Sequence, residues 1–159
     1  MLGGVLVKKS NQDNFSSDIE KYFSKITGIR IEYKKLPRDN NGKVLPISGW
    51  KLGISHSEDY LAVAVLHGGK VGIDIEVLGH KDKLTQRVLS KILCVGEKKI
   101  EGSFLNNYVI KEAYSKFVGV GLSIGFSQYD AGKLLNDKKL IWKNYSTDDY
   151  ICYLVHDIM

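Results

Sequence analysis

Val71-Gly72-Ile73-Asp74-Ile75-Glu76 is the stretch of sequence that decides the fold. Successive side chains of a strand point to opposite faces, so Asp74 and Glu76 project from one face and the two isoleucines from the other. If the isoleucines enter the core, the carboxylates stand together in a cleft, where each opposes ionisation of the other unless a cation is bound. Oxygen ligands without His or Cys suit Mg²⁺. The alternative is the polar outer face of an amphipathic strand.

The sequence on both sides of this stretch predicts a mixed α+β protein. Two β-rich apolar runs at 61–66 and 71–77 flank His67-Gly68-Gly69-Lys70, a short loop that predicts a β-hairpin. Alternation predicts a strand at 29–33, and a last strand is expected at 150–155. Helical spacing of apolar residues predicts helices at 13–26, 84–93 and 105–117, with Gly28 and Gly119 as stop signals. We expect the strands to meander with the helices on one side.

The composition fits one domain of ordinary size or two small lobes that share a core. The chain has 159 residues, 43% hydrophobic and 26% charged, and its two cysteines, Cys94 and Cys152, are expected to be reduced. The longest apolar run, 61–66, is far shorter than the roughly 20 residues of a membrane-spanning helix. The apolar residues at the start precede the lysines, the reverse of a secretory signal, so we expect a cytoplasmic protein. A net charge of +5 favours acidic partners.

A second group of candidate residues lies in the predicted helix at 105–117. In Lys111-Glu112-Ala113-Tyr114-Ser115-Lys116, Glu112 and Lys116 are four positions apart and therefore neighbours on one helix face. Such a pair is ordinarily an exposed ion pair that contributes little to stability. Alternatively, Glu112 supplies a third oxygen ligand to the metal, and Lys116 is the point charge that holds a phosphate. The helix taken alone leaves both interpretations open.

Two polar segments earlier in the chain offer groups that could bind phosphate. Ser55-His56-Ser57 provides several hydrogen-bond donors just before a predicted strand. Arg38 and Lys43 are two cations that flank a polar turn. The structural alternatives are a histidine at a strand entrance and a solvated loop.

The four motifs follow one another along the chain. They are Arg38-x-x-x-Gly42-Lys43, Ile54-Ser55-His56-Ser57, Gly72-Ile73-Asp74-Ile75-Glu76 and Lys111-Glu112-Ala113-x-x-Lys116, with Gly119-x-Gly121-Leu122 after them. In this order they resemble the motifs of the 4′-phosphopantetheinyl transferases, from about Arg38 to the C-terminus. Three positions depart from the family's usual pattern: Val44 stands in place of Pro, Glu58 in place of Gly and Tyr108 in place of Trp.

The resemblance implies a particular architecture. Short members of the family begin almost directly with the Asp motif and assemble as trimers, whereas 71 residues precede Gly72 here. The chain is similar to the longer, surfactin-synthetase-activating branch, in which two similar α+β lobes form a pseudo-dimer with the site between them. This similarity implies a shortened N-terminal lobe at 1–70, a C-terminal lobe at 71–159 with the metal and catalytic motifs, and a monomeric protein.

The resemblance also implies an activity. The family transfers 4′-phosphopantetheine from coenzyme A to a serine of an acyl or peptidyl carrier protein and releases adenosine 3′,5′-bisphosphate. Mg²⁺ on Asp74, Glu76 and Glu112 would bridge the pyrophosphate of coenzyme A, and Lys116 would neutralise charge on the transferring phosphate. The residues expected to bind coenzyme A are Arg38, Lys43, Ser55, His56 and Lys116.

A general base must accept the proton of the attacking serine hydroxyl, and Glu97 is the expected one, with Glu101 as a second candidate. The expected partner is an acidic carrier protein of fatty-acid, polyketide or nonribosomal peptide synthesis. It would dock beside the helix around Lys111 to Lys116 and on the basic segment from Lys81 to Lys99, whereas neither nucleic acid nor a membrane is expected as a partner. Two alternatives stay open: an Mg²⁺-dependent nuclease, and a non-catalytic basic domain that binds nucleic acid.

Overall fold

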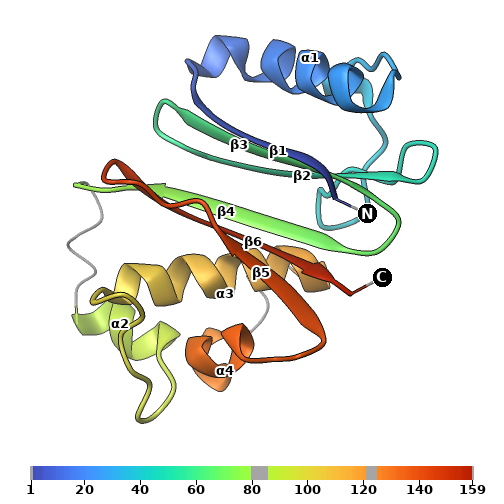
Figure 1. The fold of residues 1–159 in the computed structure, drawn as a ribbon. Helices are drawn as coiled ribbons and strands as arrows, with labels where there is room; N and C mark the ends of the chain where they lie inside the picture. Colours follow the sequence, from blue (N-terminus) through green and yellow to red (C-terminus); the bar gives the residue numbers. More distant parts are fainter. Residues whose placement is uncertain (1, 80–85, 121–124, 159) are drawn as a thin grey trace.

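The computed structural model describes residues 2–79, 86–120 and 125–158 and shows a layered α+β architecture (Figure 1). Within these ranges the chain forms two three-stranded antiparallel sheets and four α-helices, none long and apolar enough to cross a lipid bilayer. The strands are β1 (Leu2–Lys9), β2 (Trp50–Ser57), β3 (Tyr60–His67), β4 (Val71–Val77), β5 (Leu140–Asn144) and β6 (Tyr150–Asp157). The helices are α1 (Phe15–Thr27), α2 (Gln86–Ile92), α3 (Phe104–Val118) and α4 (Ala131–Leu135).

The two sheets repeat one arrangement. The first is formed by β1, β2 and β3 in the spatial order β1-β3-β2, and the second by β4, β5 and β6 in the order β4-β6-β5. In each sheet the third strand along the chain lies in the middle, and a long helix lies between the first and second strands in sequence. The described chain therefore contains two β-α-β-β units, one at 2–67 and the other at 71–157.

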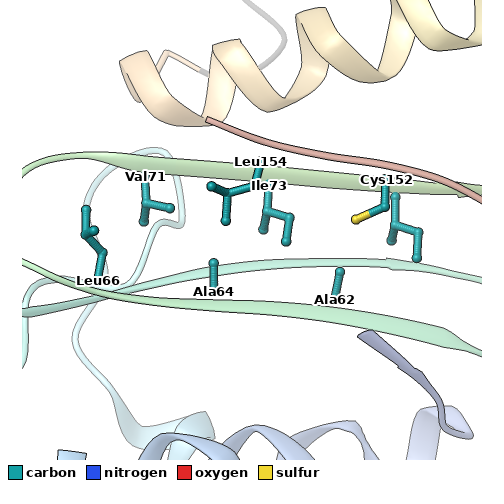
Figure 2. Packing of buried hydrophobic residues seen from close by; sticks show 8 residues of the cluster. Ala62, Ala64, Leu66, Val71, Ile73, Cys152 and Leu154 are labelled. Atoms are coloured by element: carbon teal, nitrogen blue, oxygen red, sulfur yellow. The ribbon is translucent and has the colours of Figure 1, made fainter. Parts of the chain in front are cut away.

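The main core lies between the two sheets. Figure 2 shows side chains of β3 pointing toward those of β4 and β6. Eight fully or almost fully buried residues form this layer: Ala62, Ala64, Leu66, Val71, Ile73, Ile75, Cys152 and Leu154. Because burial of one Leu, Ile or Val side chain contributes about 1.5–3 kcal/mol, this layer holds the two units together.

Helices cover the outer faces of both sheets, so the expectation that they lie on one side is wrong (Figure 1). Ile19 and Phe23 of α1 pack on the first sheet, while Leu105 and Val109 of α3 pack on the second. The reason lies in β3, which is apolar at six successive positions and therefore presents an apolar face to each side. A second cover is needed for the face that does not meet the other sheet.

The hairpin expected between 61–66 and 71–77 is also wrong, although both strands form. β3 pairs with β1 and β2, whereas β4 pairs with β6 in the other sheet. Because both edges of β3 are occupied, the chain crosses to the second sheet at Gly68 and Gly69, whose φ angles are 70° and 62°. The tight hairpin joins β2 to β3 instead, and Ser55-His56-Ser57 lies inside β2 rather than before a strand.

Residues 29–32 form no strand, in contrast to the expectation from their alternation. Ile29 and Ile31 are partly buried against the cluster beneath α1, so the alternation reflects one-sided packing of a segment without a partner strand. The strand that completes the first sheet is β1, which was not expected, and it pairs with β3. The helix expected at 13–26 is confirmed as α1, which ends at the left-handed Gly28.

β4 and α3 approach each other closely at Gly72. A Cβ atom at this position would overlap the carbonyl oxygen of Ala113 and lie 2.5 Å from the amide nitrogen of Phe117. Glycine therefore allows α3 to lie directly on the face of β4 that also carries the two carboxylates. Ser103 caps the N-terminus of α3, because its hydroxyl accepts a hydrogen bond from the amide of Leu105 at 3.2 Å.

Gly72→Ala should destabilise the protein because the added methyl group would push β4 away from α3. We expect the free energy of unfolding to fall by about 1–3 kcal/mol, the usual range for overpacking. Urea denaturation measures the change. Gly53→Ala is the matched control, because a Cβ there would meet only side-chain atoms, at 3.3 Å or more. Equal stability of the two variants would contradict the close approach.

Candidate functional site

β4 and α3 bring together the carboxylates that the sequence singled out. Ile73 and Ile75 enter the core between the sheets, so Asp74 and Glu76 project toward α3, which carries Glu112. The exposed fractions of Asp74, Glu76 and Glu112 are 5%, 8% and 9%. These three residues, here called the carboxylate cluster, are therefore buried rather than standing in an open cleft as expected.

The charges of Asp74 and Glu112 are only partly balanced by their described neighbours. Burial raises the pKa of Glu112, and the charges of Asp74 and Glu76 raise it further. Burial also raises the pKa of Asp74, although Lys116, whose Nζ lies 2.7 Å from Asp74 Oδ1, lowers it. Asp74 Oδ2 and Glu112 Oε1 are buried without a hydrogen-bond partner. These two buried oxygens without a partner favour a further cation beside them.

Two serines of β2 hold the carboxylates of β4. The hydroxyl of Ser55 accepts a hydrogen bond from the amide that follows Asp74, at 3.3 Å, and donates to Asp74 Oδ1 at 2.9 Å. The hydroxyl of Ser57 accepts from the amide that follows Glu76, at 3.0 Å, and donates to Glu76 Oε2 at 3.1 Å. Ser55 was expected to contact coenzyme A, but the structure places it on Asp74. The matched spacing of Ser-x-Ser and Asp-x-Glu was the signal for this role.

Tyr108 adds a phenol group to the carboxylate cluster. It lies one helical turn before Glu112 on α3, on the same face of the helix. Burial raises the pKa of Tyr108, and the charge of Glu112 raises it further, so the phenol stays protonated and has a proton to donate. Where the resembling family usually has Trp, this chain has a hydroxyl donor.

The donor set of the carboxylate cluster fits a hard divalent cation. Carboxylate oxygens suit Mg²⁺, and the two unpaired oxygens, on Asp74 and Glu112, would gain a partner. In the described part of the chain no three acidic, His or Cys side chains are already closed around a common point. Lys116 lies against Asp74 instead, so a bound cation would require these side chains to close around it.

A cavity of about 290 Å³ opens beside the carboxylate cluster. It lies between the loop at 38–44, β2, the start of β4 and the end of α3, and its described lining includes no carboxylate. The basic side chains of the lining are those of Arg38, Lys43, His56 and Lys116. Lys116 therefore belongs to both sites, and a cavity that favours anions adjoins a cluster that favours cations.

The loop at 38–43 is fastened to α3 by two side chains. Lys43 Nζ donates to the carbonyl oxygens of Lys116 at 2.6 Å and Val71 at 3.1 Å. Asn41 Nδ2 donates to the carbonyl oxygen of Gly119 at 2.6 Å. Burial lowers the pKa of Lys43. Because an ammonium group has three donors, Lys43 joins the two units and keeps one N–H for a ligand in the cavity.

Arg38 and His56 are the exposed basic groups of the cavity. The guanidinium of Arg38 donates to the carbonyl oxygen of Gly42 at 2.9 Å and lies 4.9 Å from the centre of the Tyr33 ring. The ring of His56 packs against Phe15, with 5.2 Å between the centroids. Both side chains are therefore held at the rim of the cavity by weak contacts that leave donors available.

Glu97, the expected general base, lies in a buried ion pair with Lys111. Asn107 donates to Glu97 Oε2 at 2.6 Å, and the amide of Cys94 donates to Oε1 at 3.1 Å beside the ammonium of Lys111. Burial opposes ionisation, but these hydrogen bonds hold the pKa of Glu97 below its ordinary value. A carboxylate with both oxygens occupied and a lowered pKa is poorly suited to accept a proton.

The expected docking surface changes in one respect. Lys111 is 2% exposed and donates to the carbonyl oxygens of Ile92 and Phe126, so it is not part of a surface. Lys81 and Lys83 lie outside the described residues, and so does the side chain of Arg87. The exposed members of the basic segment are Lys91, Lys98 and Lys99, and the second candidate base, Glu101, is also exposed.

Two comparisons with known proteins give no match for this chain. No model of a known protein family matches it, and no curated protein matches it. Its function therefore has to be inferred from the carboxylate cluster, the cavity and the motifs that build them.

Glu112→Gln should stabilise the metal-free protein near neutral pH. The pKa of Glu112 is raised on folding, so the folded state binds this proton more tightly than the unfolded state. Wild-type stability is therefore lost as the pH rises from the ordinary glutamate value through the raised one. Removing the charge should therefore add stability above that range.

Urea titrations in chelator at several pH values measure this effect. Glu101→Gln, which changes an exposed carboxylate, is the control and should keep the wild-type pH profile. A Glu112→Gln variant that is less stable than the wild type near neutral pH would contradict the electrostatic account.

Lys111→Met should destabilise the protein by about 3–5 kcal/mol, because it leaves the charge of Glu97 buried without its partner. Adding Glu97→Gln to Lys111→Met should restore part of the stability. Lys91→Met, on an exposed position of α2, is the control. Urea denaturation measures all three variants, and a loss for Lys111→Met no larger than for the control would show that the pair is not structural.

Proposed function

We propose that the protein transfers the 4′-phosphopantetheine group of coenzyme A to a serine of an acyl or peptidyl carrier protein. This is the activity of the 4′-phosphopantetheinyl transferases that its motifs resemble. The observation that carries the proposal is the contact between the carboxylate cluster and the basic cavity through Lys116. Coenzyme A has a pyrophosphate and a 3′-phosphate, so it needs a hard cation and several basic groups side by side.

Mg²⁺ is the proposed cofactor, and Asp74, Glu76 and Glu112 are the residues that would hold it. When bound, it would supply a Lewis acid and a template for the pyrophosphate. Ser55 and Ser57 orient the carboxylates of β4 through the hydrogen bonds described above. The protein thus contributes a set of oxygen ligands whose directions are fixed before any ligand binds.

The basic residues of the cavity are proposed to bind and orient coenzyme A. Arg38, His56 and the remaining donor of Lys43 would hold phosphate oxygens of the nucleotide end. The serine hydroxyl of the carrier protein forms a new O–P bond to the β-phosphate, the pyrophosphate P–O bond breaks, and adenosine 3′,5′-bisphosphate leaves. Lys116 would neutralise charge on the transferring phosphate.

Glu97 is poorly suited to accept the proton of the serine hydroxyl. Both oxygens of Glu97 are occupied, and its pKa is lowered. Glu112 is a proposed metal ligand, so its unpaired oxygen would be taken by the cation. We therefore assign a structural role to Glu97 and the proton transfer to Glu101, the exposed second candidate.

The repeated β-α-β-β units support the pseudo-dimeric architecture of the longer branch of the family. Each unit has the same strand order, and the carboxylate cluster and cavity lie where the two units meet. We place the shortened N-terminal lobe at 1–70 and the C-terminal lobe at 71–159, in a monomeric cytoplasmic protein. Both lobes contribute to one site, since Ser55 comes from the first and Asp74 from the second.

An acidic carrier protein is the proposed partner, and neither nucleic acid nor a membrane has a role in this proposal. The net charge of +5 and the exposed Lys91, Lys98 and Lys99 favour an acidic surface. Charged rims mainly steer encounter, so kcat/KM for the carrier protein should fall as salt is raised.

The activity is tested with coenzyme A and an apo carrier protein, by mass spectrometry of the carrier and by release of adenosine 3′,5′-bisphosphate. Asp74→Ala should lower kcat by orders of magnitude because it leaves an incomplete metal site. Asp148→Asn, at an exposed position, is the matched control and should keep full activity. Chelator should abolish transfer, and added Mg²⁺ should restore it.

DNA cleavage and DNA retention, measured on the same samples, test the two nucleic-acid alternatives. Undiminished transfer in chelator would overturn the metal site. Metal-dependent DNA cleavage without modification of any carrier protein would favour the nuclease instead.

A further inference from the structure

The ammonium group of Lys116 occupies a position beside Asp74 that a bound metal ion would need. Its Nζ lies 2.7 Å from Asp74 Oδ1, and its charge also lowers the pKa of Glu112 within the carboxylate cluster. The ammonium is thus the cation that the described chain itself supplies to these carboxylates. A divalent cation bound by Asp74 would compete for the same oxygen and would repel the ammonium at this distance.

The Lys116 side chain can also reach a second position, in the basic cavity. Its side chain is 33% exposed, whereas that of Asp74 is 6% exposed, so the ammonium can leave the ion pair without losing its hydration. The same side chain lines the basic cavity, and its four-carbon stem turns freely. A phosphate in the cavity would offer the departing ammonium a new anionic partner.

We propose that Lys116 is exchanged between two partners: it neutralises Asp74 while the protein is empty and moves to a substrate phosphate when a divalent cation takes its place. This inference rests on the proposed function, because it assigns a metal to the carboxylate cluster and a phosphate to the cavity. Lys116 is therefore an internal competitor of the metal as well as a phosphate ligand.

The exchange couples the two sites. A phosphate that draws Lys116 into the cavity removes the competitor from Asp74, so each ligand strengthens the binding of the other. Loss of the Lys116 charge should therefore have opposite effects on metal affinity and on catalysis. Removing the ammonium should tighten metal binding even though it removes a group that the reaction uses.

The test is the affinity for Mn²⁺ alone, measured by titration with electron paramagnetic resonance detection of the free ion, which requires no turnover. Lys116→Met should bind Mn²⁺ about tenfold more tightly than the wild type, a change of about 1.4 kcal/mol. Lys116→Gln, which also lacks the charge, should behave in the same way. Lys116→Arg keeps the cation and should match the wild type.

Arg38→Met controls for the general loss of a positive charge, because Arg38 lines the same cavity but donates, among the described contacts, to the carbonyl oxygen of Gly42. It should weaken binding of adenosine 3′,5′-bisphosphate and leave the Mn²⁺ affinity unchanged. An increase in Mn²⁺ affinity as large as that of Lys116→Met would overturn the exchange in favour of a diffuse charge effect.

The outcomes separate this inference from the proposed function. Equal Mn²⁺ affinity of the wild type and of both uncharged Lys116 variants overturns the exchange and leaves the proposed metal site standing. Failure of all variants to bind Mn²⁺ overturns the metal site, and the exchange with it. Binding by the uncharged variants that exceeds binding by the wild type supports both.

Discussion

Two serine hydroxyls join the edges of two separate sheets and, through the same contacts, fix the direction of two carboxylates. The edge of β4 that faces β2 presents amide groups, and Ser55 and Ser57 accept hydrogen bonds from two of them. Each hydroxyl then has its proton left to donate to Asp74 or Glu76. A buried polar group without a partner costs about 1–3 kcal/mol, so these hydrogen bonds are strongly favoured. The contact between β2 and β4 and the orientation of the two carboxylates therefore depend on the same two hydroxyl groups.

The rest of the site follows from carboxylates held in this way. Asp74 is buried and cannot turn to solvent, and Gly72 lets α3 come close enough for Lys116 to form an ion pair with it. The match is incomplete, because two carboxylate oxygens have no partner. Proteins retain such local imbalance where function requires it, and stability elsewhere compensates for it. Here the layer of apolar side chains between the sheets supplies that compensation.

The carboxylate cluster and Lys116 could be predicted because their signals are local. A period of two places Asp74 opposite Ile73 on β4, and a spacing of four places Glu112 and Lys116 on one face of α3. The partners of β3 and β4 could not be predicted, because β3 is apolar on both faces and its sequence does not reveal which edges are occupied. Pairing is decided by the whole chain rather than by the segment.

The ion pair of Glu97 could not be predicted from the sequence either, because it also depends on contacts between distant segments. Its position between two predicted helices suggested a free carboxylate near the site. Lys111 lies 14 positions further along the chain, and the fold brings it onto Glu97 in a buried ion pair. The hydroxyl of Ser55 was likewise assigned to a ligand, because nothing in its own segment shows that β2 and β4 lie side by side.

The fastening of the loop at 38–43 to α3 has a consequence for how the chain folds. Asn41 and Gly119 are 78 positions apart, and Lys43 and Lys116 are 73 apart. Contacts of such long range form late, because the entropy of closing the intervening loop is lost before the contact is gained. The hairpin of β2 and β3 has only short loops to close and can form early. The contacts that fasten this loop are therefore expected to form after that hairpin, so the basic cavity is completed late in folding.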